Sequence, residues 1–329
     1  MSMYQHCTRN VALISLGCAM AASAQVSTIN SAVYTPRQFN DVPAATLTVV
    51  SNYPTLISFE EKNVSKATGF ANRDSWHFSN NSGASPFLFG NSDYFTATMT
   101  VTLTGDPISP RKEAGFVFNN PLNDGGEFIV NTDGHEFVAF GGFLPFYTFS
   151  GNNTAFRFNS GDTVTMGMTY FKDSNGKNAI IYFARTATAC MESPVLEFSN
   201  LELGVIDGTS IGGYLQIVNS PTIATNSGKA VFQNIKISGP DQDFDGVPDS
   251  ADQCPNTPPC SAVDANGCSI DQLAPCAGPA SGGAWKNHGQ YISAVAQAAE
   301  ELLSQGLISS DQKDALIGAA AQSNCGSKK

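Results

Sequence analysis

Strict alternation of apolar and polar residues marks the first two thirds of the chain. In residues 95–104, FTATMTVTLT, every second position is apolar and the positions between them are threonine. Successive side chains of a strand point to opposite faces, so this pattern predicts a strand with one buried face. The apolar set is Phe95, Ala97, Met99, Val101 and Leu103, and the polar set is Thr96, Thr98, Thr100, Thr102 and Thr104. We expect the threonine set to form a solvated face, and a binding surface is the alternative.

The same alternation recurs around short turns. Residues 126–142 and 163–185 each read as two strands, joined at Asp133-Gly134 and Asn175-Gly176. GYLQIVN at 213–219 and AVFQNIKIS at 230–238 add two more strands. About ten to fourteen strands separated by turns, without intervening helices, predict an antiparallel β sandwich.

Two of these segments carry a resemblance to a known family. VTMGMTYFKDSNGKNAIIYFAR is similar to the penultimate hairpin of concanavalin A-like, laminin-G-type jelly rolls, and AVFQNIKIS is similar to their closing strand. The resemblance covers roughly residues 45–238. It implies a jelly-roll, lectin-like sandwich and no particular activity.

The period changes near the end of the chain. In residues 287–306 the apolar positions recur at helical spacing, and Gly306 can end that helix. The stripe comprises Ile292, Val295, Ala296, Ala299, Leu302 and Leu303. Ser309 and Gln312 form a capping box for a second helix that runs through Ala321. This pattern predicts a short α-helical hairpin.

Composition and charge narrow the class of protein. Charged residues are 14% of the chain, there are 22 phenylalanines, and the net charge is −11. Low charge with many aromatic and β-branched residues is typical of an extracellular β protein. The acidic balance argues against nucleic acid or an anionic membrane surface as a partner and suits a protein that meets cations.

Residues 1–24 read as an export signal. Arg9 forms the positive region, an apolar core follows, and Ala22-Ser23-Ala24 is a cleavage site. The apolar run is too short to span a bilayer, and no later segment is apolar enough to do so. A lipoprotein signal at Cys18 is an alternative, although Ser15 stands where such signals want an aliphatic residue. We expect a secreted, periplasmic or cell-surface protein, cleaved near Ala24.

Six of the eight cysteines follow the signal, and five of those six lie after residue 250. An even number in an oxidising compartment predicts disulfides. Cys254 and Cys268 flank a turn-rich segment and close a loop of favourable size, so we expect them to pair. We expect Cys276 to pair with Cys325 and tie the segment to the end of the hairpin. Cys190 and Cys260 are left without an assignment.

The most distinctive segment is DQDFDGVPDSAD, residues 241–252. Its carboxylates fall at positions 1, 3, 5, 9 and 12, with glycine at position 6. Calcium takes six to eight hard oxygen ligands, which such spacing supplies when alternate side chains turn inward. We expect direct side-chain ligands from Asp241, Asp243, Asp245 and Asp252, the carbonyl of Val247, and a contact through water from Asp249. The alternative is a solvated acidic linker.

The local context disfavours an EF-hand, because Gly239-Pro240 opposes an incoming helix. DQDFDGVPDSADQCPNTP instead resembles a thrombospondin type 3 repeat, as found in exported bacterial proteins. VDANGC, with Asp264, Asn266 and Gly267, is similar to a degenerate second repeat. The terminal segment from Trp285 also resembles a helical tail that follows such repeats. The resemblance implies Ca²⁺ as the cofactor.

No pattern indicates a familiar catalytic site. The E-x-D-x-x-E pattern of sandwich glucanases is absent, and Glu60 and Glu61 point to opposite faces. Glu127 and Glu136 are a weak candidate pair across the Asp133-Gly134 turn. Cys190 with a histidine is a still weaker candidate for a nucleophile pair. His77 reads as a packed histidine.

The favoured hypothesis is therefore a non-catalytic, calcium-binding module that recognises an extracellular glycan or surface protein. The alternatives are a polysaccharide hydrolase or lyase with a non-standard site and a structural matrix or envelope component. Exposed aromatic rings can stack on sugars, and the candidates are Trp76, Phe143, Phe146 and Tyr147. The predicted organisation is a signal at 1–24, a sandwich at 25–238, a calcium-binding Cys/Pro-rich stalk at 239–280 and a helical hairpin at 281–329.

Overall fold

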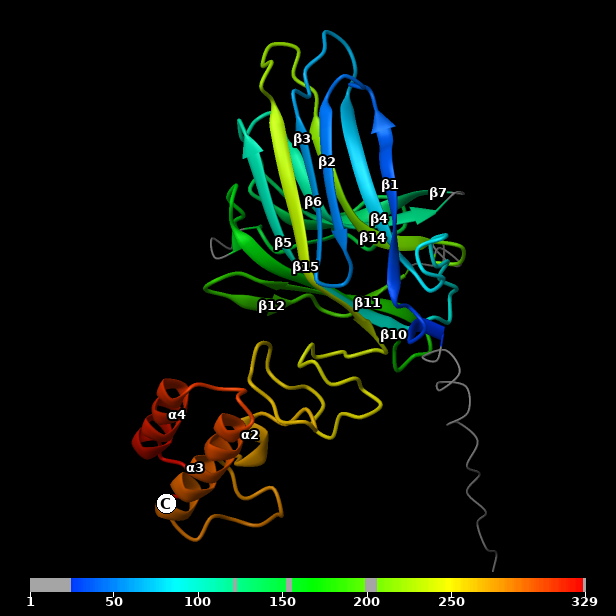
Figure 1. Ribbon diagram of the computed structural model, residues 1–329. Coiled ribbons are helices and arrows are strands. Elements are labelled where there is room, and N and C mark those ends of the chain that lie inside the picture. The colour runs from blue at the N-terminus through cyan, green and yellow to red at the C-terminus, as the bar shows by residue number, and fades with distance from the viewer. Residues whose placement is uncertain (1–24, 121–122, 152–155, 199–205, 328–329) are drawn as a thin grey trace, which may run out of the picture.

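Most of the chain forms two antiparallel sheets that pack face to face (Figure 1). The computed structural model describes residues 25–120, 123–151, 156–198 and 206–327. The predicted export signal, with Arg9, Ser15, Cys18 and the cleavage site, lies outside the described residues. No helix in the described part of the chain is long and apolar enough to cross a membrane.

The first sheet has seven strands, and every neighbouring pair in it is antiparallel. In spatial order its strands are β1 (Ser31–Asn40), β4 (Ala71–Ser79), β14 (Ser210–Val218), β6 (Lys112–Asn120), β7 (Asn123–Asn131), β8 (Phe137–Phe140) and β9 (Tyr147–Thr148).

The second sheet has eight strands and is also antiparallel. In spatial order its strands are β12 (Cys190–Glu192), β11 (Asn178–Arg185), β10 (Thr163–Lys172), β5 (Phe95–Asp106), β15 (Ser227–Ser238), β3 (Leu56–Lys62) and β2 (Thr46–Asn52), with β13 (Leu196–Glu197) beside β11.

The core between the sheets is aromatic. The five apolar residues predicted to share one face of β5 are all fully buried there. Phe232 packs against Phe59 and Trp76 with ring centroids 6.0 and 6.1 Å away. Burying one such ring contributes about 1.5–3 kcal/mol, so this core dominates the stability of the sandwich.

Three short helices follow the sandwich (Figure 1). They are α2 (Ile270–Leu273), α3 (His288–Ser304) and α4 (Ser310–Gln322). The predicted capping box at Ser309 and Gln312 begins α4, and Gly306, with φ +72°, follows the end of α3. Helix α3 buries Tyr291, Val295, Ala299 and Leu302, a stripe that begins one residue before the predicted one.

The prediction of a mainly β antiparallel sandwich with C-terminal helices is confirmed. Strand β15 ends at Ser238, and residues 239–269 then contain turns and no strand or helix. Figure 1 shows this yellow segment between the sandwich and the orange and red helices. Its position makes it the connection between two separate cores.

Candidate metal centre and adjoining cavity

The aspartate segment folds into a tight loop directly after β15. The amide of Gly246 donates to Asp241 Oδ2 at 3.0 Å, and the amide of Val247 donates to Asp245 Oδ1 at 2.7 Å. Gly246 has φ +99°, a conformation that favours glycine. This turn brings alternate side chains of the loop toward one point.

Three carboxylates converge inside the loop. Asp241, Asp243 and Asp245 each place one oxygen within 4.8 Å of the others. Asp241 is 5% exposed and Asp243 is 9% exposed. Asp241 Oδ1 and Asp245 Oδ2 are buried without a hydrogen-bond partner. Buried, unpaired carboxylate oxygens at this separation are unfavourable unless a cation neutralises them.

The pKa values reflect the same crowding. Burial raises the pKa of Asp241 to about 8, and the charges of Asp245 and Asp243 add to the effect. Burial also raises the pKa of Asp245 to about 6, with further contributions from Asp243 and Asp252. The cluster is therefore a set of hard oxygen donors in an environment that disfavours their bare charges.

Asp252 lies beside this cluster. Gly267, with φ +82°, packs so closely that a Cβ there would overlap Asp252 Oδ1 and lie 2.7 Å from Asp245 Oδ2. Asp252 Oδ1 also accepts a hydrogen bond from the amide of Cys254. The residues fit a calcium site in ligand type and convergence, with Asp252 next to the three central carboxylates.

Asp249 occupies a different position in the loop. Its Oδ1 accepts from the amide of Gln242 at 2.9 Å, and its Oδ2 accepts from Gln242 Nε2 at 2.6 Å. Both oxygens therefore bond to Gln242, one to its backbone amide and one to its side chain. The predicted ligand roles of the Asp249 carboxylate and the Val247 carbonyl stay predictions.

The segment that resembles a second repeat forms a local turn. Asp264 Oδ1 accepts from the amides of Asn266 and Cys268 at 2.8 and 3.0 Å. Cys254 and Cys268 form the first predicted disulfide and close this turn onto the loop. Cys276 and Cys325 form the second, and the two unassigned cysteines, Cys190 and Cys260, form the third.

The loop packs on the outer face of the eight-stranded sheet. The amide of Asp241 donates to Thr96 Oγ1 at 2.8 Å, and Thr169 Oγ1 donates to the Asp241 carbonyl at 2.7 Å. Phe244 stacks on Phe183 with ring centroids 5.0 Å apart. The expectation of a fully solvated threonine face is therefore wrong at Thr96, which the loop buries, although Thr104 is exposed.

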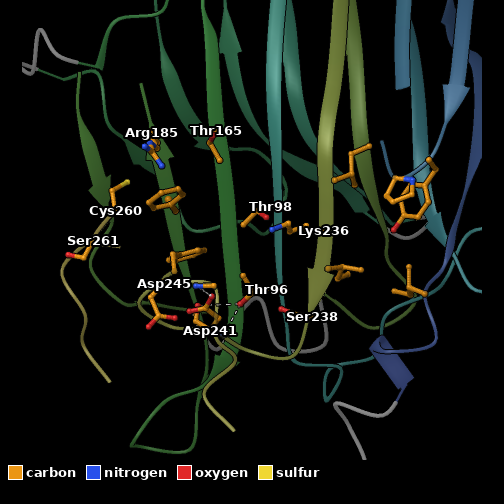
Figure 2. A pocket seen from close by; sticks show the side chains of 18 of the residues that line it. Thr96, Thr98, Thr165, Arg185, Lys236, Ser238, Asp241, Asp245, Cys260 and Ser261 are labelled. Atoms are coloured by element: carbon orange, nitrogen blue, oxygen red, sulfur yellow. Dashed lines mark hydrogen bonds between the residues drawn. The ribbon is translucent and has the colours of Figure 1, made fainter. Parts of the chain in front are cut away.

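A cavity of about 650 Å³ opens between this sheet face and the loop (Figure 2). Thr98, Thr165, Arg185 and Lys236 line it from the sandwich, and Asp241, Phe244 and Asp245 line it from the loop. The sequence offered the threonine face as an alternative binding surface, but it did not indicate that Arg185, Lys236 and the loop would join that face around one cavity.

Glu192 is another residue that the sequence did not indicate. It lies on β12, beside a second cavity of about 700 Å³ that Asp243 and Asp252 also line. Its Oε1 is buried without a partner, and burial together with the charge of Asp243 raises its pKa to about 7. The disulfide from the neighbouring Cys190 brings this strand to the loop segment.

Two of the four aromatic candidates for sugar contact are corrected. Trp76 is 0% exposed and Phe143 is 3% exposed, because both rings belong to the sandwich core. Tyr147 is half-buried and packs on Phe149, with ring centroids 4.9 Å apart. Phe146 is 68% exposed and keeps an open ring face.

The two glutamates considered as an acid and base do not face each other. In the β7–β8 ladder Glu127 pairs with Phe140, whereas Glu136 lies beyond the Val130–Phe137 pair at the opposite end. Glu127 instead accepts from Arg73 at 2.9 Å, and Glu136 from Arg111 at 3.5 Å. Cys190 is disulfide-bonded and so cannot act as a thiolate.

A polar network covers the outer face of the seven-stranded sheet. Tyr214 donates to Glu113 Oε2 at 3.2 Å, and Gln216 Nε2 donates to the same oxygen at 3.1 Å. The guanidinium of Arg73 lies 4.6 Å from the centroid of the Tyr214 ring. Tyr214 is fully buried beneath these groups, so its phenol is shielded from any substrate in this conformation.

His77 is buried as the sequence predicted. It is 1% exposed, and neither ring nitrogen has a hydrogen-bond partner. Burial lowers its pKa to about 4, so the imidazole is neutral near pH 7. It offers no charge to a ligand at that pH.

Comparison with known proteins gives only distant similarities. No protein-family model matches the chain, and no curated protein matches it. Among solved structures, the chain is similar to a family 14 alginate lyase from Aplysia kurodai, with 10% identity, a TM-score of 0.38, and coverage of 59% of this chain and 87% of the lyase.

Two further structures show the range of these similarities. The alginate lyase from Klebsiella pneumoniae has 11% identity and a TM-score of 0.36, with 64% of this chain and 95% of that one covered. Arcelin-5, a lectin-like defense protein from Phaseolus vulgaris, has 12% identity and a TM-score of 0.34, with 64% and 98% covered. At these values the assignment of a β sandwich rests on the observed sheets.

Proposed function

We propose that this protein is an exported, calcium-binding and non-catalytic module that recognises an extracellular glycan. The observation that carries the calcium assignment is Asp241, a buried carboxylate with an unpartnered Oδ1 among two further carboxylates. A hard divalent cation at this point satisfies the orphaned oxygens and removes the repulsion. Asp241, Asp243, Asp245 and Asp252 are the proposed side-chain ligands, with the Val247 carbonyl completing the set.

The proposed calcium ion has a mechanical consequence. Asp241 is bonded through its backbone to Thr96 and Thr169 of the sandwich. Ordering its side chain around a cation therefore holds the whole loop against the sheet. Calcium thereby stabilises the loop and one wall of the adjoining cavity together.

Calorimetry of the full mature chain tests the metal assignment. We expect one calcium ion to bind with a Kd on the order of 10⁻⁴ to 10⁻³ M, and magnesium to compete poorly because it demands a tight octahedron. Asp245→Ala removes one inward oxygen and should weaken binding at least tenfold. If no calcium-dependent heat is seen at millimolar metal with all three disulfides formed, the loop is a solvated acidic linker and the metal assignment is wrong.

Limited proteolysis tests the mechanical role. With calcium present, residues 239–280 should resist cleavage, and a chelator should expose them while the sandwich stays intact. The magnitude follows from linkage, since a ligand at 100 times its Kd adds about 2.7 kcal/mol to the unit that it stabilises. Equal cleavage with and without calcium would contradict the proposed role.

Glycan recognition is supported by the cavity beside the loop, whose volume of about 650 Å³ lies in the range of ligand sites. The non-catalytic assignment is supported by the positions of the candidate carboxylates, since Glu127 and Glu136 are each paired with an arginine. A glycan array with and without calcium tests recognition. Release of reducing ends or unsaturated uronates from the same panel would favour the alternative, a polysaccharide hydrolase or lyase with a non-standard site.

Export agrees with the three disulfides, which persist in oxidising compartments. We propose that the mature chain starts at Gln25 and reaches the cell exterior, the cell surface or the periplasm. Amino-terminal sequencing of the exported protein tests this start. A mature chain that begins with a lipid-modified Cys18 would instead support the lipoprotein alternative.

A further inference from the structure

Four adjacent strands present a row of polar side chains to the cavity. Thr165 of β10 lies opposite Arg185 of β11, and Thr98 of β5 lies opposite Lys236 of β15. Because β10 pairs directly with β5, the two pairs sit on neighbouring strands of one face. Figure 2 shows the four labelled side chains along these strands, above the loop that carries Asp241 and Asp245.

A β-bulge places Lys236 on this face. The register of β15 against β5 shifts between Gln233 and Lys236, and Asn234 within the shift has φ +50°. Phe232 and Ile235 are both buried in the core, although they are three positions apart and regular alternation would place them on opposite faces. The extra residue thus exchanges the two faces of the strand, and Lys236 points outward where unbroken alternation would bury it.

The two basic groups in the row are free to bind a ligand. Arg185 and Lys236 are exposed, and in the described ranges neither has an ion pair. By contrast, Arg37, Arg73 and Arg111 are each paired with a carboxylate. Unpaired cations beside a cavity of an acidic protein indicate a ligand that carries negative charge.

We propose that this cavity binds an anionic oligosaccharide. Its carboxylate or sulfate groups pair with Arg185 and Lys236, and its hydroxyls bond to Thr98 and Thr165. Three strand spacings separate β11 from β15, a width of about 14 Å, which suits a short oligosaccharide better than one sugar unit. The inference rests on the proposed glycan-binding function and names its ligand class and its site.

Calcium and saccharide binding should be coupled. Asp241 and Asp245 line the same cavity as the two basic groups. Without a cation the carboxylates of the loop oppose an anionic ligand, and a bound calcium ion offsets two of their negative charges. The saccharide should therefore bind more tightly to the calcium-loaded protein, and by reciprocity it should raise the affinity for calcium.

Calorimetry with the full mature chain and defined probes tests the proposal. The probes are oligogalacturonate, a sulfated dextran oligosaccharide, neutral maltohexaose and a single-stranded DNA oligonucleotide, each with calcium and with chelator. Arg185→Gln and Lys236→Gln are the test variants. Arg157→Gln and Lys229→Gln are matched controls, because both are exposed cations outside this cavity and Lys229 lies on the same strand as Lys236.

We expect one or both anionic saccharides to bind the calcium-loaded protein. Comparing oligogalacturonate with the sulfated dextran oligosaccharide shows whether the site recognises carboxylate or sulfate groups. Each test variant should weaken binding about tenfold or more, since a charge-assisted hydrogen bond contributes about 1.5–3 kcal/mol. The control variants should stay within about twofold of the unmodified protein. Equal losses in test and control variants would indicate nonspecific attraction and overturn the site.

The remaining outcomes separate this inference from the proposed function. Binding of maltohexaose alone would overturn the anionic ligand and keep glycan recognition. DNA that binds as tightly as the saccharides would overturn the ligand class. If the protein gives heat on calcium addition but binds no anionic saccharide, the inference is overturned and the calcium site is supported. Saccharide binding through Arg185 and Lys236 without calcium heat would keep the site and overturn the metal assignment.

Discussion

The sandwich and the loop segment that follows it are held together in opposite ways. The sandwich buries a continuous cluster of aromatic and aliphatic side chains between two sheets. Residues 239–280 form no cluster of their own: Phe244 packs on the sheet, and Ile270 and Ala274 pack with the terminal helices. Disulfides, turns and carboxylates supply the rest of its order. Stability in the sandwich comes from buried apolar area, whereas the loop segment depends on its disulfides and on hydrogen bonds within its turns.

The difference explains where chemistry is placed. Apolar contacts hold the buried core, so its geometry is insensitive to solvent ions. The loop segment concentrates carboxylates whose mutual repulsion a bound cation would relieve. The cavity lies at the junction, with one rigid wall from the sheet and one wall that depends on the loop.

The largest expected effect comes from truncating the sandwich core. Phe232 is fully buried between Phe59 and Trp76. Phe232→Ala should lower the free energy of unfolding by about 3–5 kcal/mol, because it removes buried area and leaves a cavity. Urea denaturation measures the loss, with the exposed Phe146→Ala as the control, expected within about 0.5 kcal/mol of the unmodified protein. A small loss at Phe232 would mean that the core is not the main source of stability.

Removing the Cys254–Cys268 disulfide should destabilise the loop segment and leave the sandwich folded. Cys254 and Cys268 are 14 residues apart, and a closed loop of this size contributes about 3 kcal/mol. Replacing both with serine should speed protease cleavage within 239–280 and leave the urea transition of the sandwich in place. The matched control, Cys276→Ser with Cys325→Ser, should loosen the helical unit. Loss of the sandwich transition in the Cys254/Cys268 variant would show that the two regions unfold together.

Acid should act on the sandwich through His77. Its pKa is about 4 when folded and near 6.5 when unfolded, so below pH 6.5 the unfolded chain binds the extra proton. The stabilising contribution is complete above pH 6.5 and is lost as pH falls toward 4, a loss of about 2 kcal/mol between pH 7 and pH 5. Buried carboxylates with raised pKa values, such as Glu61 and Glu192, act in the opposite direction, so the His77 contribution is read as a difference between proteins. In urea denaturation at both pH values, the change in unfolding free energy should differ by this amount between the unmodified protein and His77→Leu. A His135→Gln control should behave like the unmodified protein, and equal changes in the unmodified protein and His77→Leu would contradict this assignment.

Much of the fold could be predicted from local patterns. The alternation in β5 identifies its buried face, and the capping box identifies the start of α4, because both features depend only on neighbouring residues. The spacing of Asp241, Asp243 and Asp245 predicted a convergent cluster for the same reason, and the structure brings these three together.

The features that could not be predicted depend on distant parts of the chain. Lys236 faces the cavity because a bulge interrupts the alternation of β15. The apolar positions change phase between Phe232 and Ile235, but this local signal does not say which distant segments form the cavity. Glu192 reaches the second cavity because a disulfide links residues 70 positions apart. Trp76 was assigned to a surface role from its residue type, whereas its direction is set by the pairing of β4 with β1 and β14.

The smallest expected effect distinguishes two roles for one carboxylate of the loop. Asp249 contributes both oxygens to Gln242, outside the three convergent carboxylates. Asp249→Asn keeps an acceptor for the Gln242 amide and removes one charge, so the calcium Kd should rise by only about twofold, the effect of an exposed charge several ångströms away. Asp245→Asn makes the identical change inside the cluster and should raise the Kd at least tenfold. Calorimetry of the two variants at one ionic strength makes the comparison.

Equal weakening would make Asp249 a ligand, directly or through water, and the Gln242 contacts would then have to break when calcium binds. A twofold effect would leave Asp249 as a brace of the loop and limit the side-chain ligands to Asp241, Asp243, Asp245 and Asp252.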